Sequence, residues 1–175
     1  MAVTIHQKEE AGQYPDAPDG LTDAAGELEP GMVWARLEQW IAHRWSARNV
    51  QWVVEGPGEW SPPLVPAVID DMDEWHPEGW QTVSLPLAPM GYELPRGKFR
   101  FSATVGEGPV PDDAQEAYRR LAEYYAAEAG GVPGATSYSA NLGDVSESWR
   151  RSASHIARAI HNSGAADLLR PYRRA

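Results

Sequence analysis

The chain has 175 residues, among them 25 acidic and 15 basic side chains, eight tryptophans and no cysteine, and its formal net charge is −10 at pH 7. Without cysteine it can form neither a disulfide scaffold nor a thiolate metal site, and its apolar runs are too short to predict a membrane-spanning helix. The negative charge argues against a general DNA-binding surface, which requires clustered Lys and Arg.

Charge is unevenly distributed along the chain. Residues 1–30 sum to −6 and residues 49–95 to −8, whereas residues 148–175 carry six arginines against one aspartate and sum to +5. An acidic body with a basic end favours contact with a partner or with another copy of the chain. The alternative interpretation is a solvated arginine-rich end.

The first 30 residues are rich in Gly, Pro, Asp, Glu and Ala and poor in large apolar side chains. Such a segment buries too little surface to offset the entropy of ordering it. We therefore expect residues 1–30 to form an extended acidic arm, residues 31–164 to form one domain, and residues 165–175 to form a short basic tail.

Within the domain, apolar residues recur at three- and four-residue steps from Val33 to Trp45, which predicts a helix over 32–48. Residues 50–105 change to short alternating strands separated by Gly/Pro turns, which predicts a small antiparallel sheet with its clearest strand at 98–105. Pro111, Asp112 and Asp113 predict the start of a helix over 111–129, and a last helix is expected over 145–163. The predicted fold class is α+β, a small bundle of three main helices with an inserted small antiparallel sheet and extended arms at both ends.

No arrangement of residues predicts catalysis. The acids Asp70, Asp71, Asp73 and Glu74 are nearly contiguous and lack the alternation and the glycine of a calcium loop, so a charged strand edge or turn is favoured over a cation or acid–base site. His155 and His161 lie six residues apart, on different sides of a helix rather than at the spacing of a zinc pair. We expect no enzyme activity, no metal site and no cofactor.

The tryptophans are more numerous than one small core hides, because the indole is bulky and its N–H needs a partner. Some are expected at protein–protein contacts, where tryptophan is enriched. Trp40 and Trp45 are expected in the core, whereas Trp34, Trp60 and Trp75 are candidates for a subunit interface.

Three stretches of the chain together resemble the head–tail connector (adaptor) proteins of long-tailed phages (siphophages), prophages and gene transfer agents. They are Phe101-Ser102-Ala103-Thr104-Val105-Gly106 followed by Val110-Pro111, the run Ala117–Tyr124, and the ending Leu168-Leu169-Arg170-Pro171-Tyr172-Arg173-Arg174. The resemblance covers roughly residues 32–175. Residues 1–31 depart from it, because many relatives begin with helices there.

The resemblance implies a small helical bundle with an inserted β element that forms a dodecameric ring below the portal and extends the DNA channel toward the tail. It implies a structural virion protein of the head–tail neck, assembled in the cytoplasm of the bacterial host, without catalysis or cofactor. Its partners would be the portal protein, other copies of itself and a stopper or other neck protein on the distal side, with no membrane involved and duplex DNA passing without specific binding. The C-terminal segment would dock on the portal through Leu168, Leu169, Arg170, Pro171, Tyr172, Arg173 and Arg174.

Other functions stay open at this point. One is another neck component, a stopper or tail terminator, although such proteins are usually β-rich throughout. A second is a tryptophan-rich carbohydrate- or peptide-binding module. A hydrolase that uses the acids between Asp70 and Glu74 is the least favoured.

Overall fold

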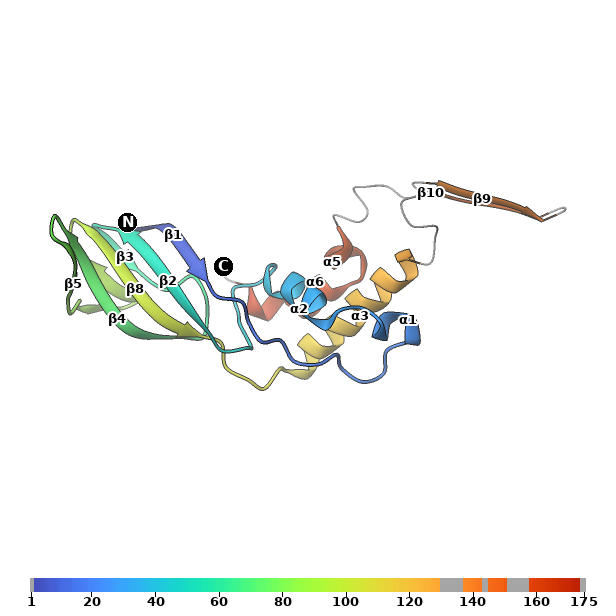
Figure 1. The fold of residues 1–175 in the computed structure, drawn as a ribbon, viewed down its shortest axis with the longest axis horizontal. Coiled ribbons are helices and arrows are strands. Elements are labelled where there is room, and N and C mark those ends of the chain that lie inside the picture. The colour runs from blue at the N-terminus through green and yellow to red at the C-terminus, as the bar shows by residue number, and fades with distance from the viewer. Residues whose placement is uncertain (1, 130–136, 143–144, 151–157, 174–175) are drawn as a thin grey trace. The chain divides into compact units, whose positions relative to one another are not determined.

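The computed structural model describes residues 2–129, 137–142, 145–150 and 158–173, and it divides into two compact units (Figure 1). Met1–Gln13 and Ala42–Pro109 form one, which we call the β unit; Tyr14–Ile41 and Val110–Ala175 form the other, the helical unit. Each unit is built from two separate stretches of the chain. The boundaries expected at residues 30 and 164 therefore do not coincide with those of the units.

The β unit contains two antiparallel sheets. The larger is five-stranded, in the order β1 (Val3–Glu9), β2 (Arg48–Glu55), β8 (Lys98–Val105), β4 (Ala67–His76) and β5 (Gly79–Thr82). The smaller is three-stranded, in the order β3 (Gly58–Trp60), β7 (Gly91–Leu94) and β6 (Leu87–Ala88).

The core of the β unit lies between these sheets. Buried and exposed residues alternate along β2 and β8, so that one face of each strand points inward, as expected for a sheet with one covered face. Trp52 pairs with Phe101 across the two strands, and Trp60 of the smaller sheet stacks on Phe101 with ring centroids 4.2 Å apart. Aromatic packing therefore joins the two sheets, and the opposite face of the larger sheet, which we call the outer face, points away from this core.

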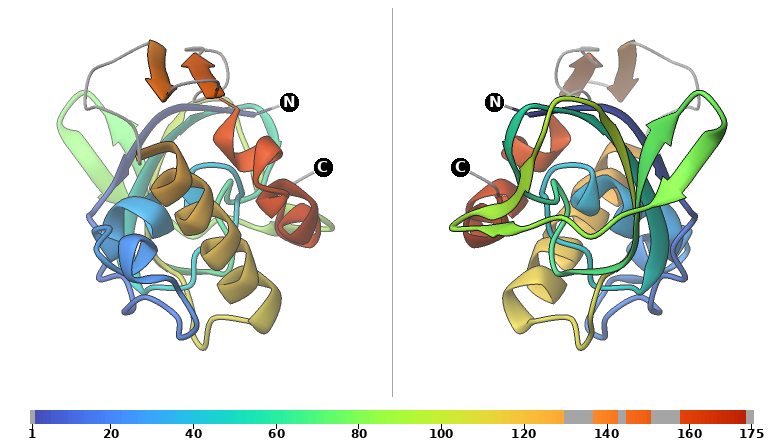
Figure 2. Two further views of the ribbon diagram at one scale, coloured as in Figure 1. Left: turned by 90° about the vertical axis from the view of Figure 1, so that its right-hand side faces the viewer. Right: turned by 90° about the vertical axis from the view of Figure 1, so that its left-hand side faces the viewer.

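The helical unit is organised around one long helix, α3 (Asp112–Ala129), which corresponds to the helix predicted over 111–129. Asp112 and Asp113 lie in its first turn, where the helix dipole favours negative charge. Two short helices, α1 (Asp23–Gly26) and α2 (Pro30–Glu38), pack against α3 from the N-terminal stretch. From the C-terminal stretch come α5 (Ala159–Asn162), α6 (Ala165–Leu168) and a 3₁₀ turn at Arg170–Tyr172, and Figure 2 shows α5 and α6 beside α3.

The predicted fold class is wrong. The structure is not a helical bundle with a small inserted sheet, because the five- and three-stranded sheets form a unit with a hydrophobic core of its own. The physical reason is that Trp52, Trp60, Phe99 and Phe101 are all buried between these sheets. Large aromatic side chains supply enough buried apolar area for the β segment to be an independent layer structure.

The helix predicted over 32–48 is also wrong in extent, since α2 ends at Glu38 and Arg48 already begins β2. The apolar residues with helical spacing belong to two different units. Val33 and Leu37 are buried in the helical unit, whereas Trp45 is buried in the β unit. A periodicity that continues across a unit boundary gives a false signal of one long helix.

Residues 1–30 are not an extended arm, because they supply strand β1 and helix α1. The polar side chains of β1 accept hydrogen bonds from buried indoles: Trp52 Nε1–H donates to Gln7 Oε1 (2.8 Å) and Trp60 Nε1–H donates to Thr4 Oγ1 (2.8 Å). The segment is ordered by backbone pairing and by satisfying these donors, and the apolar residues that it buries are the small Ala2 and Ala25.

The helix predicted over 145–163 is wrong at its start. Val145–Arg150 is strand β10, antiparallel to β9 (Ser137–Leu142), and the helix α5 covers only Ala159–Asn162. Residues 151–157 of the predicted helix lie outside the described residues. The two strands pair in an unbroken register from Val145 with Leu142 to Arg150 with Ser137, and this pairing replaces the weak helical pattern.

Candidate functional site

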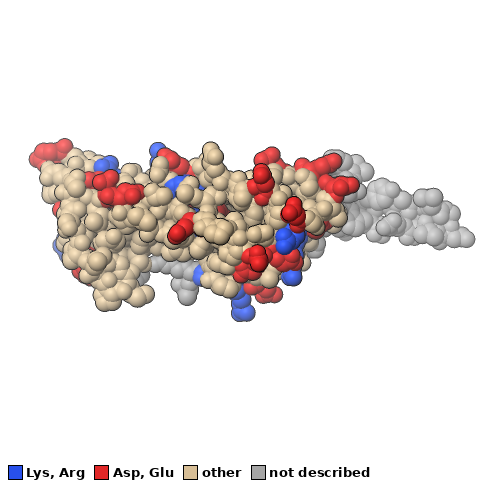
Figure 3. All heavy atoms as spheres, turned by 90° about the horizontal axis from the view of Figure 1, so that it is seen from below, with Lys and Arg blue, Asp and Glu red and all other residues tan. Residues whose placement is uncertain are grey.

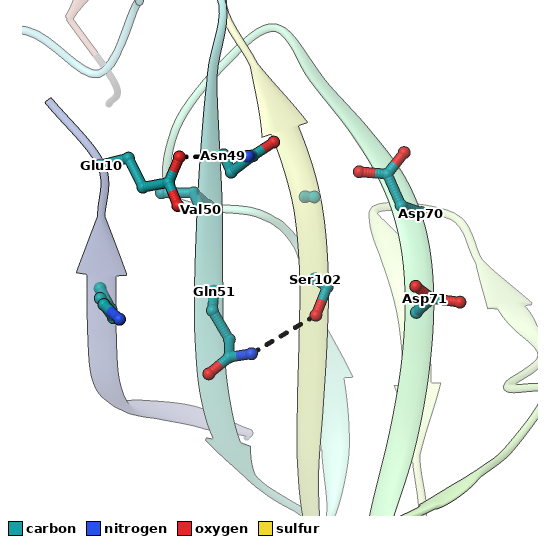
Figure 4. Close-up of a pocket in the computed structure, with 9 residues that line it drawn as sticks. Glu10, Asn49, Val50, Gln51, Asp70, Asp71 and Ser102 are labelled. Atoms are coloured by element: carbon teal, nitrogen blue, oxygen red, sulfur yellow. Dashed lines mark hydrogen bonds between the residues drawn. The ribbon is translucent and has the colours of Figure 1, made fainter. Parts of the chain in front are cut away.

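A shallow polar depression lies on the outer face of the five-stranded sheet and has a volume of about 250 Å³. Figure 4 shows polar side chains from four adjacent strands and their flanks around it: Lys8, Glu10, Asn49, Gln51, Asp70, Asp71 and Ser102. Several are already paired with one another. Asn49 Nδ2 donates to Glu10 Oε2 (3.1 Å), and Gln51 Nε2 donates to Ser102 Oγ (3.5 Å).

The acids between Asp70 and Glu74 do not converge on one site. Asp70, at a bulge in β4, accepts a hydrogen bond from Thr104 Oγ1 (3.1 Å), and Asp73 forms an ion pair with Arg100 (2.7 Å). Glu74 lies 3.4 Å from His76 Nε2. The described residues contain no group of three or more His, Asp or Glu side chains placed to hold a metal ion. This arrangement gives no support to the hydrolase hypothesis.

An aromatic cluster occupies the outer face beside the edge strand β5. Trp75 is 50% exposed and lies edge-to-face against Trp80, its partner across the β4–β5 pair. The Arg100 guanidinium lies 4.7 Å above the Trp80 ring, and Asp73 Oδ1 accepts a hydrogen bond from Thr82 Oγ1 (3.3 Å). Because neighbours on three strands hold this cluster in place, Trp75 is an exposed aromatic side chain on a rigid support, the usual form of an interface anchor.

The other two tryptophans predicted at a subunit interface are buried. Trp34 is 2% exposed and packs against Tyr118 in the helical unit, with ring centroids 4.6 Å apart. Trp60 is part of the β unit core, as described above. Of Trp34, Trp60 and Trp75, only Trp75 is available to a partner at the surface of its unit.

Two arginines that sequence reasoning left without a role are buried in the β unit. Arg44 and Arg48 both bind the carboxylate of Glu9, through contacts of 2.7 and 3.2 Å, and their side chains are 9% and 4% exposed. The three residues connect the end of β1 to the segment that leads into β2. Glu9 is the shared member of this cluster, so its removal would take a carboxylate away from two buried guanidinium groups in a medium of low dielectric constant.

The C-terminal segment is folded onto the helical unit and is not a free tail. Leu169 is completely buried, and the Tyr172 hydroxyl donates to the Asp113 carboxylate at the start of α3 (2.8 and 3.1 Å). Burial, the hydrogen bond to Asp113 and the charge of that carboxylate raise the pKa of Tyr172 to about 12. The Arg173 guanidinium lies 4.7 Å above the Trp40 ring, which also packs edge-to-face with His161.

The residues predicted to bind a portal differ in how far they are exposed. Arg170, Pro171 and Arg173 are exposed, Leu168 and Tyr172 are half-buried, and Leu169 belongs to the core of the unit. Arg174 lies outside the described residues. The surface that the segment offers is therefore made of arginines on a short folded support, and Leu169 stabilises that support from inside.

Acidic side chains are scattered over the face shown in Figure 3, with few basic ones between them. Residues 49–95, which carry eight acids and no Lys or Arg, lie entirely within the β unit. No helix among the described residues is long and apolar enough to cross a membrane. Comparison with models of known protein families, with curated proteins and with solved structures gives no match for this chain.

Proposed function

We propose that this protein is a head–tail connector (adaptor) of a long-tailed phage or gene transfer agent, a structural ring component between the portal and the tail. The observation that carries the proposal is that exposed apolar side chains occur at separate places on the β unit. Val3 and Ile5 lie on edge strand β1, Trp75 lies beside edge strand β5, and Leu87 and Met90 lie in and after β6; all are 49–79% exposed.

Separate apolar patches are what a ring subunit requires. In a head-to-tail ring each copy contacts its two neighbours through two different surfaces, and each surface needs its own anchors. Val3 with Ile5, and Leu87 with Met90, are close pairs of exposed apolar side chains at different places on the β unit, which makes them candidates for such anchors. The resemblance of residues 32–175 to adaptor proteins supports the same assignment.

The charges fit a channel component. Many copies arranged around one axis, each with a net charge of −10, would repel a DNA duplex. Proteins bind DNA tightly when their basic groups displace counterions from the phosphates, and without such contacts the genome would pass without binding. The exposed Arg170 and Arg173 would meet an acidic surface of the portal, where guanidinium groups bind carboxylates through two parallel hydrogen bonds.

The test is binding to the cognate portal, measured by co-sedimentation and by cryo-electron microscopy of the mixture. Deletion of residues 165–175 is a poor test, because it removes Leu169 and Ala165 from the core. The double variant Arg170→Glu and Arg173→Glu keeps that core and should weaken portal binding at least tenfold. Arg158→Glu, at the other end of the C-terminal segment, is the matched control and should bind normally.

The β content supports a second candidate in the same assembly. Stoppers and tail terminators are β-rich, and the β unit with its five- and three-stranded sheets resembles that composition more than a helical adaptor does. The same binding experiment separates the two candidates. Capture of the portal supports the adaptor, whereas capture of the tail or of an adaptor, with no affinity for the portal, supports a stopper or terminator.

A further inference from the structure

We propose that β5 of one copy pairs with β1 of the next copy, so that the β units join head to tail in one continuous sheet. This inference rests on the proposed function and specifies how neighbouring copies of the ring would recognise each other. The starting observation is that β1 and β5 are the two outermost strands of the five-stranded sheet. An outermost strand leaves a row of backbone N–H and C=O groups unpaired on one side.

The hydrogen-bond pattern identifies which groups point outward. Val83 N–H donates to Met72 C=O (2.9 Å), and because bonded and non-bonded pairs alternate in an antiparallel ladder, the backbone groups of Thr82 and Trp80 face away from β4. On the other edge, Glu10 N–H donates to Asn49 C=O (3.0 Å). By the same alternation, the backbone N–H and C=O groups of Glu9 and Gln7 face away from β2. Each edge therefore presents two residues ready for strand addition.

The extent of regular backbone is similar on the two edges. The β1–β2 pairing shifts between Thr4 and His6, so the regular part of β1 is His6–Glu9, and β5 spans Gly79–Thr82. Both are four-residue strands. Because the two strands have the same length, each can pair with the other along its whole regular part, and no long stretch of either strand stays unpaired in water.

Side chains on the two edges are also complementary. The apolar Val3 and Ile5 are exposed on β1, and the Trp75–Trp80 pair lies at the β5 edge. Lys8, the single Lys or Arg among residues 1–30, lies on β1, whereas residues 70–82 contain five acids and no Lys or Arg. Joining the edges would bring apolar groups together and place the Lys8 ammonium beside an acidic and aromatic surface.

Strand direction favours a ring over a closed pair. Five strands that alternate in direction leave β1 and β5 running the same way, so the β5-to-β1 contact is parallel and repeats with the same rotation at each step. Repetition of one heterologous contact generates a ring where the rotation closes and an open filament where it does not, and the ring is the form that the proposed function requires. Pairing of β1 with β1, or of β5 with β5, would be antiparallel and would end at a dimer.

Disulfide trapping tests the contact directly, because the chain has no cysteine of its own. A full-length chain with Lys8→Cys and Thr82→Cys places one thiol on each edge, and His6→Cys with Thr82→Cys samples the neighbouring register. After mild oxidation at high protein concentration, we expect a non-reducing gel to show a ladder of dimers, trimers and larger species. Disulfides form only where Cα atoms come within about 7 Å, so the ladder reports the contact itself.

The controls separate this contact from random collision. Lys8→Cys combined with Ser102→Cys, on central strand β8, should give no ladder, and each single cysteine variant should stop at dimers. Circular dichroism of the reduced variants verifies folding. Failure of both edge pairs to give species larger than a dimer, or a ladder of equal yield from the Ser102 pair, would overturn the proposal.

Proline provides a second measurement. Thr82→Pro removes the outward N–H and leaves the β4 ladder bonds in place, and Thr82→Val is its matched control, since it also lacks the hydroxyl that donates to Asp73. In sedimentation experiments, self-association should weaken at least tenfold in Thr82→Pro and remain in Thr82→Val. Equal association of the two variants would contradict pairing through this edge.

The two proposals fail in different ways. If the cysteine pairs on the two edges give a ladder of cross-linked species but the protein binds no portal, the edge contact is supported and the adaptor function is refuted. Portal binding that depends on Arg170 and Arg173, with no ladder even on the portal, would support the adaptor and refute the edge contact.

Discussion

The contact between Tyr172 and Asp113 holds the end of the chain against the first turn of α3, and its strength can be measured. The Tyr172 hydroxyl donates to both carboxylate oxygens, and Asp113 also accepts from the N–H of Ala114. We expect Tyr172→Phe to lower the free energy of unfolding of the helical unit, since the carboxylate then loses a donor and the segment loses a hydrogen bond to the first turn of α3.

The magnitude follows from the pKa. A rise from 10.0 to about 12 corresponds to at most about 2.7 kcal/mol of preference for the neutral phenol, and the partial exposure of Tyr172 reduces this. A hydrogen bond to a charged group contributes about 1.5–3 kcal/mol, so about 1–2 kcal/mol is the expected coupling. Because folding raises the pKa, this stability is complete below pH 10 and is lost as the pH rises from 10 toward 12.

The assay is a double-mutant cycle of Tyr172→Phe and Asp113→Asn, with unfolding in urea followed by tryptophan fluorescence. The cycle separates the pair from the interaction of Asp113 with the helix dipole, which Asp113→Asn also removes. Tyr125→Phe is a suitable control, as no hydrogen bond of its hydroxyl is seen within the described part of the chain. A coupling energy near zero, or an ultraviolet titration in which the tyrosine missing from Tyr172→Phe ionises near pH 10, would refute the reasoning.

The remaining predictions concern the β unit. Trp60→Ala should cost about 3–5 kcal/mol of stability because it empties the space between the sheets, whereas Trp75→Ala should change the stability of the isolated chain by less than about 1 kcal/mol, as measured by urea unfolding. Equal losses of stability in the two variants would contradict the placement of Trp60 in the core and of Trp75 at the surface. Glu9→Gln should destabilise by about 3–5 kcal/mol, since it removes the carboxylate charge that the buried guanidinium groups of Arg44 and Arg48 both contact; a loss below about 1 kcal/mol in the same assay would show that water reaches this cluster.

The sequence by itself was sufficient to predict those helices and strands whose formation depends on neighbouring residues. Pro111, Asp112 and Asp113 marked the start of α3, and the alternation over 98–105 marked β8, because helix starts and half-buried strands depend on neighbouring residues. The turn between Trp75 and Trp80 contains Pro77 and Gly79 and is one of the Gly/Pro turns expected within residues 50–105. The absence of cysteine and the uneven charge are properties of composition and needed no structure.

Only the tertiary structure decided the division into two units and the fate of the polar N-terminal stretch. The residues with helical spacing from Val33 to Trp45 are divided between two units, which no local pattern reveals. Strand β1 is held by buried indole donors and by Arg44 and Arg48, all distant in sequence. Propensity and periodicity in the sequence indicate which apolar side chains a segment can bury. A buried tryptophan N–H or arginine also needs a hydrogen-bond or ion-pair partner, and that partner is distant in the sequence and comes near only when the chain folds.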